Sequence, residues 1–170
     1  MPLRKPCPIS DKHILHTFTS GNPLLDDWLR DRAAYNQEQG FSRTFVVADE
    51  DYNVVGYHSL CAGMIHRNDV TRSVKGSQAP AEIPVAGLAR LAVDRAFQGH
   101  GLGAALLKNA LMSVVSSAQL VAFRAVVVHA IDDEAVSFYR KYHFCATKGM
   151  ERRLILPTRD IVASIAVVTG

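Results

Sequence analysis

The chain of 170 residues has no long apolar run and only three cysteines. A helix that spans a bilayer needs about 20 consecutive apolar residues, so we expect no membrane segment. The N-terminal MPLRKP lacks the apolar core of a signal peptide. Cys7, Cys61 and Cys145 are odd in number and far apart, which predicts neither a disulfide framework nor a CxxC zinc site. These absences favour a cytoplasmic protein.

The net charge of the chain is also small. The 19 Lys and Arg stand against 16 Asp and Glu, a net charge of +3, which by itself does not indicate nucleic-acid binding. The excess is uneven, because residues 140–170 hold six Lys or Arg but two Asp or Glu, which leaves residues 1–139 at −1. Polyanion binding near the C-terminal end and a merely solvated basic face are both open.

Local patterns predict one domain over residues 1–170 in which strands and helices alternate. In chain order we expect a helix over 23–39, strands over 44–48 and 54–64, a loop over 65–84, a strand over 85–93, a helix over 101–117, a strand over 121–128, a helix over 132–142 and a strand pair over 146–156. An antiparallel first half followed by a βαβ-like second half predicts an α/β fold with a mixed sheet. The apolar segment 161–170 has no assigned role.

Three glycines, Gly99, Gly101 and Gly103, fall within five positions just ahead of a predicted helix. Free amides and the dipole at a helix N-terminus bind anions, and glycine lets the backbone approach a phosphate. Gly99-x-Gly101-x-x-Ala104 fits the loose dinucleotide pattern, but it begins six residues past Val93 and no acidic residue follows about 20 positions on. A P-loop is excluded, since no Gly-Lys-Ser/Thr follows. A turn that serves only helix packing is the structural alternative.

Two motifs resemble those of a known family. LAVDxxxQGxGLG, residues 91–103, resembles the acetyl-CoA signature Q/R-x-x-G-x-G/A of the GNAT N-acetyltransferases, which follows a V-D strand end. DxxAxxFYxxxHF, residues 132–144, is similar to the family pattern N-x-x-A-x-x-F-Y-x-x-x-G-F. The resemblance implies a GNAT fold, with a mixed and mostly antiparallel central sheet that is splayed at the acetyl-CoA site and flanked by helices.

Other segments resemble one GNAT subgroup, the acetyltransferase toxins of type II toxin–antitoxin pairs. They are SGNPLLDDWL (20–29), SRTFV (42–46), GYHSL (56–60), GLARLAVD (87–94) and VHAIDDEA (128–135), and the similarity spans roughly residues 9–157. It implies a toxin that acetylates the free amine of aminoacyl-tRNA by direct attack in a ternary complex and so blocks translation. It also implies a homodimer and a ribbon–helix–helix antitoxin, through which alone DNA would be bound.

The resemblance also assigns the binding of acetyl-CoA, the expected co-substrate. The expected residues are Leu91, Ala92, Val93, Gln98, Gly99, His100, Gly101, Leu102, Gly103, Ala104, Asp132 and Phe138. The backbone of the first three would hold pantetheine as an added strand, and the run 98–104 would take the pyrophosphate. Direct transfer requires no acyl-enzyme, and no metal is expected.

Tyr139 is the expected general acid. A phenol with a pKa near about 10 stays protonated at neutral pH and can protonate a leaving thiolate. The α-amine of an aminoacyl group titrates near about 7.7–8.0, so a fair fraction is already neutral. Whether a general base exists is therefore open, with His129 as the one candidate.

Two positions depart from the family pattern. Asp132 stands where many members have Asn, and His143 stands where glycine usually ends the helix. Two other functions compete with the toxin hypothesis. One is a GNAT enzyme that acts on a small-molecule or protein amine, and the other is a non-catalytic CoA-binding module, which the intact Tyr139 disfavours.

Overall fold

The computed structural model of the chain describes residues 2–169, with side chains through residue 166. These residues form two compact units. The first unit comprises the chain up to Cys61 together with Ala89–Ala110, and the second comprises Ala62–Leu88 together with the chain from Leu111 onward. Within residues 2–169, no helix has the length and apolar character needed to cross a membrane.

Seven strands are hydrogen-bonded in the order β1-β2-β3-β4-β5-β7-β6. Their bounds are β1 Cys7–Pro8, β2 Arg43–Ala48, β3 Val54–His66, β4 Glu82–Val93, β5 Ala125–His129, β6 Cys145–Ala146 and β7 Arg153–Pro157. The β4–β5 pair is parallel, whereas β1–β2, β2–β3, β5–β7 and β6–β7 are antiparallel. The predicted α/β fold with a mixed, mostly antiparallel sheet is thereby confirmed.

Six helices accompany these strands within the described residues. They are α1 Pro23–Asp31, α2 Ala33–Gln39, α3 Arg72–Lys75, α4 Leu102–Ser117, α5 Asp133–Lys141 and α6 Ile161–Thr169. The segment between β3 and β4, expected to be a plain loop, contains α3 and a 3₁₀ turn at Arg67–Asp69.

The first helical segment begins as the sequence predicts but is interrupted. The Asn22 side chain accepts a hydrogen bond from the backbone amide of Leu24 at 2.9 Å, with Pro23 as the first helical residue. The single helix expected as far as Gln39 is wrong, because the backbone leaves helical geometry at Arg32, where φ is −125° and ψ is −29°. Apolar residues continue at a spacing of four across this break, so periodicity carries no signal for it.

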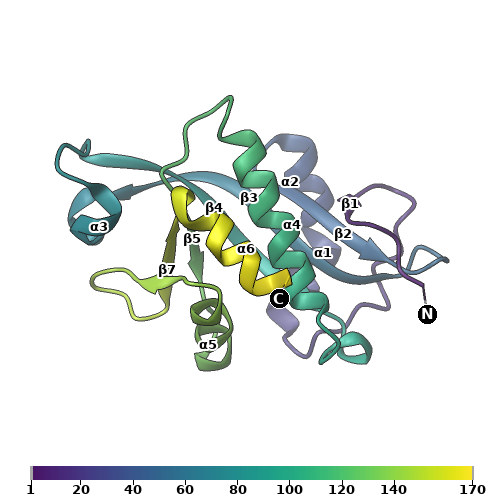
Figure 1. The fold of residues 1–170 in the computed structure, drawn as a ribbon. Helices are drawn as coiled ribbons and strands as arrows, with labels where there is room; N and C mark the ends of the chain where they lie inside the picture. Colours follow the sequence, from purple (N-terminus) through teal and green to yellow (C-terminus); the bar gives the residue numbers. More distant parts are fainter. Residues whose placement is uncertain (1, 170) are drawn as a thin grey trace. The chain divides into compact units, whose positions relative to one another are not determined.

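The first unit has an apolar core on each face of its strands. On one face, Val46 and Tyr57 pack with Leu25 and Leu29 of α1. On the other face, Val47 and Val55 pack with Leu106 of α4. Alternation of side chains along a strand produces both cores from the same strands, and α1 and α4 accordingly lie on opposite faces of β2 and β3 (Figure 1).

The second unit departs from the predictions at two apolar segments. The strand expected from Val121 begins only at Ala125, and Leu120 and Val121 are 91% and 61% exposed. An apolar run predicts a buried strand only if tertiary structure covers it, which does not happen to these residues. The C-terminal apolar segment forms α6, where the buried Ser164 hydroxyl donates to the carbonyl of Tyr142 at 2.7 Å.

His58 is a fully buried imidazole between β3 and α4 of the first unit. Its Nε2 lies 2.8 Å from Oδ1 of Asn109, and its ring stacks on Phe45 with centroids 5.2 Å apart. Its Nδ1 has no hydrogen-bond partner among the described residues. Burial lowers the pKa of His58, because the charged ring would lose its hydration and would place a second N–H where no acceptor lies.

We expect the free energy of unfolding to fall as the pH drops below about 6.5, the unfolded value for histidine. A depressed folded pKa stabilises the fold above the unfolded pKa and loses that contribution as the pH falls through the folded value. Denaturant titrations between about pH 5 and 8 measure this free energy of unfolding. Its dependence on pH should be shallower for His58→Gln than for wild type. An exposed histidine, His16, supplies the control variant His16→Gln, and an unchanged slope in His58→Gln would contradict the assignment.

Candidate active site

The C-terminal end of β4 leads into the glycine loop. Pairing between β4 and β5 runs from Val85 with Ala125 to Leu88 with Val128, although β4 continues to Val93. Beyond Leu88, β4 therefore has no β5 partner, as the expected splay of the sheet requires. An extended ligand that adds a strand needs an unpaired backbone edge of this kind.

The glycine loop, residues 98–101, is open and rich in free amides. Gly99 and Gly101 adopt left-handed φ values of +80° and +85°, and a Cβ built on either would meet no atom within 4 Å. Ala105 is the first residue whose amide bonds back, to the carbonyl of Gly101 at 3.1 Å. The amides of residues 99–104 find no acceptor within the described chain. Together with the dipole of the 16-residue α4, these amides can cradle a pyrophosphate.

The polar side chains of the loop shape it from within. Gln98 donates through Nε2 to the carbonyls of Ser20 at 2.8 Å and Val93 at 2.9 Å. The imidazole Nδ1 of His100 lies 2.8 Å from the Gln98 carbonyl oxygen. Both residues were expected to bind the cofactor, and these contacts place the side chain of Gln98 in the loop's own framework.

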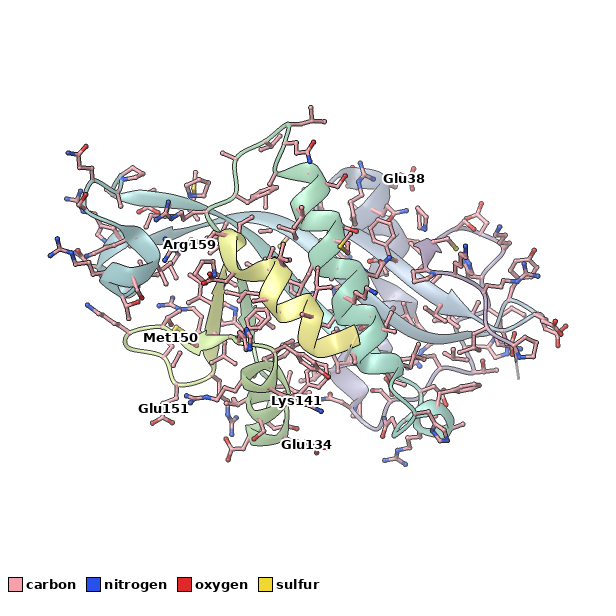
Figure 2. All side chains as sticks on the ribbon, in the orientation of Figure 1. Glu38, Glu134, Lys141, Met150, Glu151 and Arg159 are labelled. Carbon is pink, nitrogen blue, oxygen red and sulfur yellow. The ribbon has the colours of Figure 1, made fainter. Side chains whose placement is uncertain are left out.

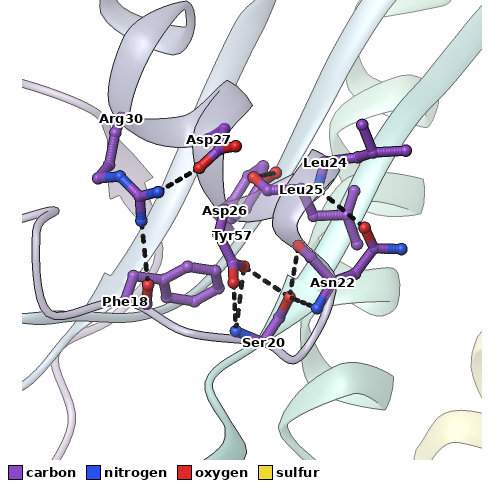
Figure 3. A network of polar contacts seen from close by, with 9 residues as sticks. All are labelled: Phe18, Ser20, Asn22, Leu24, Leu25, Asp26, Asp27, Arg30 and Tyr57. Carbon is purple, nitrogen blue, oxygen red and sulfur yellow. Dashed lines mark hydrogen bonds and ion pairs between the residues drawn. The ribbon is translucent and has the colours of Figure 1, made fainter.

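A polar network ahead of α1, which sequence reasoning missed, holds the other side of the loop. Asp94 accepts hydrogen bonds from the amides of Ala96 at 2.9 Å and Thr19 at 3.0 Å. Ser20, the next residue, donates its hydroxyl proton to the buried carboxylate of Asp26 at 2.6 Å (Figure 3). The glycine loop is thus tied to α1 through Thr19 and Ser20. The only sequence signal was the pairing of Ser20 and Asp26 around the Asn22 cap.

The second unit carries Tyr139 on α5. Asp132 caps this helix by accepting from the amide of Ala135 at 2.8 Å, and that is the observed role of its carboxylate. Tyr139 is 5% exposed and meets Phe138 and Phe144 edge-on, with centroids 5.1 and 5.4 Å away. Burial raises the pKa of Tyr139 well above its usual value, so the phenol is neutral at physiological pH.

The Tyr139 hydroxyl makes no hydrogen bond within the described part of the chain. It is also not among the fully buried atoms that lack a partner, which are Ser42 Oγ and His58 Nδ1. It therefore keeps access to solvent and has its proton available. After α5 the chain turns at His143 with φ +74°, the left-handed conformation that glycine would adopt at this position.

The basic C-terminal residues are spread over different elements and partly neutralised. Arg152 pairs with Asp133 at 3.2 Å and Arg153 with Asp69 at 3.7 Å. These neighbours point to different partners, as their adjacent positions predict. Lys141 lies on α5 together with Glu134 (Figure 2). Arg159 also lies 4.0 Å from Asp160, so three of the six basic side chains of residues 140–170 have a carboxylate partner.

Comparison with known proteins identifies the family. Residues 41–145 match the model of the acetyltransferase (GNAT) domain. This match covers more than half of the chain, so the protein belongs to the GNAT acetyltransferases, as the two motifs predict. It is therefore an acetyl-CoA-dependent N-acetyltransferase.

The chain is also similar to particular proteins within this family. The chain is 41% identical over 157 residues to the tRNA-acetylating toxin of Mycobacterium tuberculosis, covering 92% of this chain and 93% of that protein. It resembles AtaT complexed with acetyl-methionyl-tRNAfMet, at 26% identity and a TM-score of 0.88, over 96% of this chain and 99% of that one. It also resembles an AtaT Y144F mutant toxin bound to the C-terminus of the antitoxin AtaR and acetyl-CoA, at 25% identity and a TM-score of 0.80, over 96% and 98% of the chains.

Proposed function

We propose that the protein is a toxin that transfers an acetyl group from acetyl-CoA to the free amine of aminoacyl-tRNA and thereby blocks translation. The observation that carries this is the 41% identity with a tRNA-acetylating toxin across 92% of the chain. Such coverage extends beyond the acetyl-CoA motifs into the N-terminal segment. Acetylation of a small-molecule or protein amine is the alternative.

We propose that the glycine loop and the end of β4 bind the donor. The free amides of residues 99–104 would hold the pyrophosphate, and the edge of β4 beyond Leu88 would hold pantetheine. The open space at Gly99 and Gly101 fits this group, since a Cβ there would occupy the approach to the backbone. The donor supplies a thioester whose carbonyl carbon is the electrophile.

Tyr139 is the proposed acid in a direct transfer. The neutral amine forms the new N–C bond, the C–S bond breaks, and the phenol gives its proton to the departing sulfur. The amine's surplus proton passes to water, from which Tyr139 is reprotonated. The raised pKa and the unbonded hydroxyl of Tyr139 support this role, because they keep an available proton at neutral pH. An α-amine with a pKa near about 7.7–8.0 needs no dedicated base.

Assembly and location complete the proposal. We propose a cytoplasmic homodimer that is neutralised by a ribbon–helix–helix antitoxin and reaches DNA only through it. The complex of the related AtaT mutant with the AtaR C-terminus supports an antitoxin partner. We also propose a single acetyltransferase domain over residues 1–170, since the family match at 41–145 includes residues of both units.

The test is transfer of radiolabelled acetyl groups to a total pool of charged tRNA. Labelled N-acetyl-aminoacyl-tRNA is expected, and none is expected after the same tRNA has been deacylated, since the 3′ hydroxyl lacks the amine. Expression in growing cells should halt protein synthesis. If charged tRNA stays unlabelled while a polyamine or a protein acquires the labelled acetyl group, the alternative function is established instead.

A further inference from the structure

Arg90 is a half-buried cation in the first unit whose charge is not neutralised. Its guanidinium carbon lies 4.1 Å from the ring centre of Trp28, which it covers. Within the described part of the chain, Arg90 has no ion pair, and none of its N–H groups donates a hydrogen bond. A partly desolvated guanidinium with unused donors is costly unless something else pairs with it.

Aromatic rings pack beside Arg90, and no carboxylate lies within ion-pair distance of it among the described residues. Trp28 stacks on Tyr57 at 6.1 Å with planes 12° apart, and the Tyr57 hydroxyl donates to the carbonyl of Leu25 at 2.7 Å. Burial raises the pKa of both Tyr57 and Cys61, the ionisable groups that interact with Arg90, so both are neutral at physiological pH. The carboxylate of Asp26 acts on the pKa of Tyr57 and not on that of Arg90. Arg90, Trp28 and Tyr57 are called the Arg90 platform below.

A second arginine in the same unit, Arg4, has the same stacking geometry, but its guanidinium donates hydrogen bonds. Arg4 covers the ring of Tyr52 at the same distance of 4.1 Å. Its Nε donates to the carbonyl of Asp49 at 3.2 Å, and its Nη2 donates to the carbonyl of Glu50 at 3.0 Å. The stacking geometry is shared, and the unused donors are what distinguish Arg90.

The Arg90 platform lies on the side of β4 opposite to the helix that follows the glycine loop. Leu91 and Val93 pack with Leu102 of α4, whereas Ala92 packs in the cluster that Trp28 adjoins. Arg90 covers Trp28 and so shares the side of Ala92, as alternation along a strand requires. The phosphates of the donor, assigned to the N-terminus of α4, are therefore not the natural ligand of this guanidinium.

We propose that Arg90, supported by Trp28, binds a phosphodiester at the 3′ end of the acceptor tRNA. The inference rests on the proposed function and adds the residue that would recognise the acceptor. Arginine suits this ligand because its planar fork donates two hydrogen bonds to phosphate oxygens. The single-stranded end of tRNA also offers unstacked bases, which favour aromatic and guanidinium surfaces.

The test compares Arg90→Gln with the matched control Arg4→Gln. Arg90→Gln should raise the KM for charged tRNA about 10- to 100-fold, the usual effect of losing a hydrogen bond to a charged group. The slope of log(kcat/KM) against log[salt] should become shallower by about 0.7, the value for one phosphate contact on a single strand. Arg4→Gln should match wild type in both, and the acetyl-CoA affinity of both variants should stay within about twofold, a margin well below that effect.

Binding of a fluorescent, uncharged RNA minihelix that ends in CCA separates this inference from the proposed function. Weaker binding by Arg90→Gln alone supports the inference even if wild type acetylates no tRNA, an outcome that would refute the toxin proposal. Equal RNA affinity and equal salt slopes for all three proteins would overturn the inference. A parallel loss of acetyl-CoA affinity in Arg90→Gln would also overturn it, because the guanidinium would then serve the donor phosphates.

Discussion

Replacing Tyr139 by phenylalanine should lower kcat for acetyl transfer by about 10²- to 10⁴-fold, the range for loss of a positioned general acid. The substitution removes one oxygen and leaves the ring contacts with Phe138 and Phe144 in place. That oxygen makes no hydrogen bond within the described residues, so its removal leaves no partner unsatisfied. Single-turnover transfer to charged tRNA measures the effect, and calorimetry should give an acetyl-CoA affinity within about twofold of wild type, since KM and binding report separate steps.

Tyr142, the residue that caps the C-terminus of α5, provides a matched control. It is also 5% exposed and also meets Phe138 edge-on, with centroids 5.2 Å apart. Tyr142→Phe removes a phenol from a similarly buried aromatic ring and should retain wild-type kcat. Equal loss in both variants would mean that the helix, rather than the Tyr139 proton, was disturbed. Retention of wild-type kcat by Tyr139→Phe would eliminate the proposed acid.

Gly101→Glu should abolish measurable acetyl-CoA binding. The backbone at Gly101 has φ +85°, where a side chain costs about 1–2 kcal/mol. The glutamate would also place a carboxylate beside the amides proposed to hold pyrophosphate, and such like-charge contact costs several kcal/mol more. The combined effect exceeds about 100-fold in affinity, and calorimetry with acetyl-CoA measures it.

Gly40 separates backbone strain from charge at the loop. It ends α2 with φ +80°, and a Cβ built there would also meet no atom within 4 Å. Gly40→Glu therefore introduces similar strain and the same charge away from the glycine loop, and it should bind acetyl-CoA normally. Gly101→Lys tests the sign of the charge, because it keeps the backbone strain at residue 101 but replaces the negative charge by a positive one. Binding of acetyl-CoA by Gly101→Glu at wild-type affinity would refute the pyrophosphate site.

Local chemistry explains several features that lie within short stretches of the sequence. The Asn22 cap, the left-handed glycines of the loop and the turn at His143 each depend on a few adjacent residues. A cap needs a side-chain acceptor at the right position, and a left-handed turn needs a residue that tolerates positive φ. Such requirements are written in consecutive residues and hold whatever the rest of the chain does.

Features that depend on distant contacts were missed or wrong. The interruption at Arg32, the late start of β5 at Ala125 and the docking of α6 by Ser164 all reflect which apolar surfaces the fold covers. The Ser20–Asp26 bond is local, yet its importance arises because Gln98, 78 residues away, donates to the Ser20 carbonyl. Periodicity cannot anticipate a contact across such a separation.

Short motifs are sufficient to identify the family and to predict the glycine loop as the acetyl-CoA site, because their spacing follows from backbone and phosphate geometry. Contacts between distant segments govern which side chains remain free to act. Burial keeps the Tyr139 phenol neutral and its hydroxyl makes no hydrogen bond among the described residues, while internal hydrogen bonds assign Gln98 to the loop framework. Arg90 shows the same division, since its sequence position is that of an ordinary strand residue. Only the fold places it over Trp28 without an ion pair among the described residues, and the proposed phosphate ligand follows from that position.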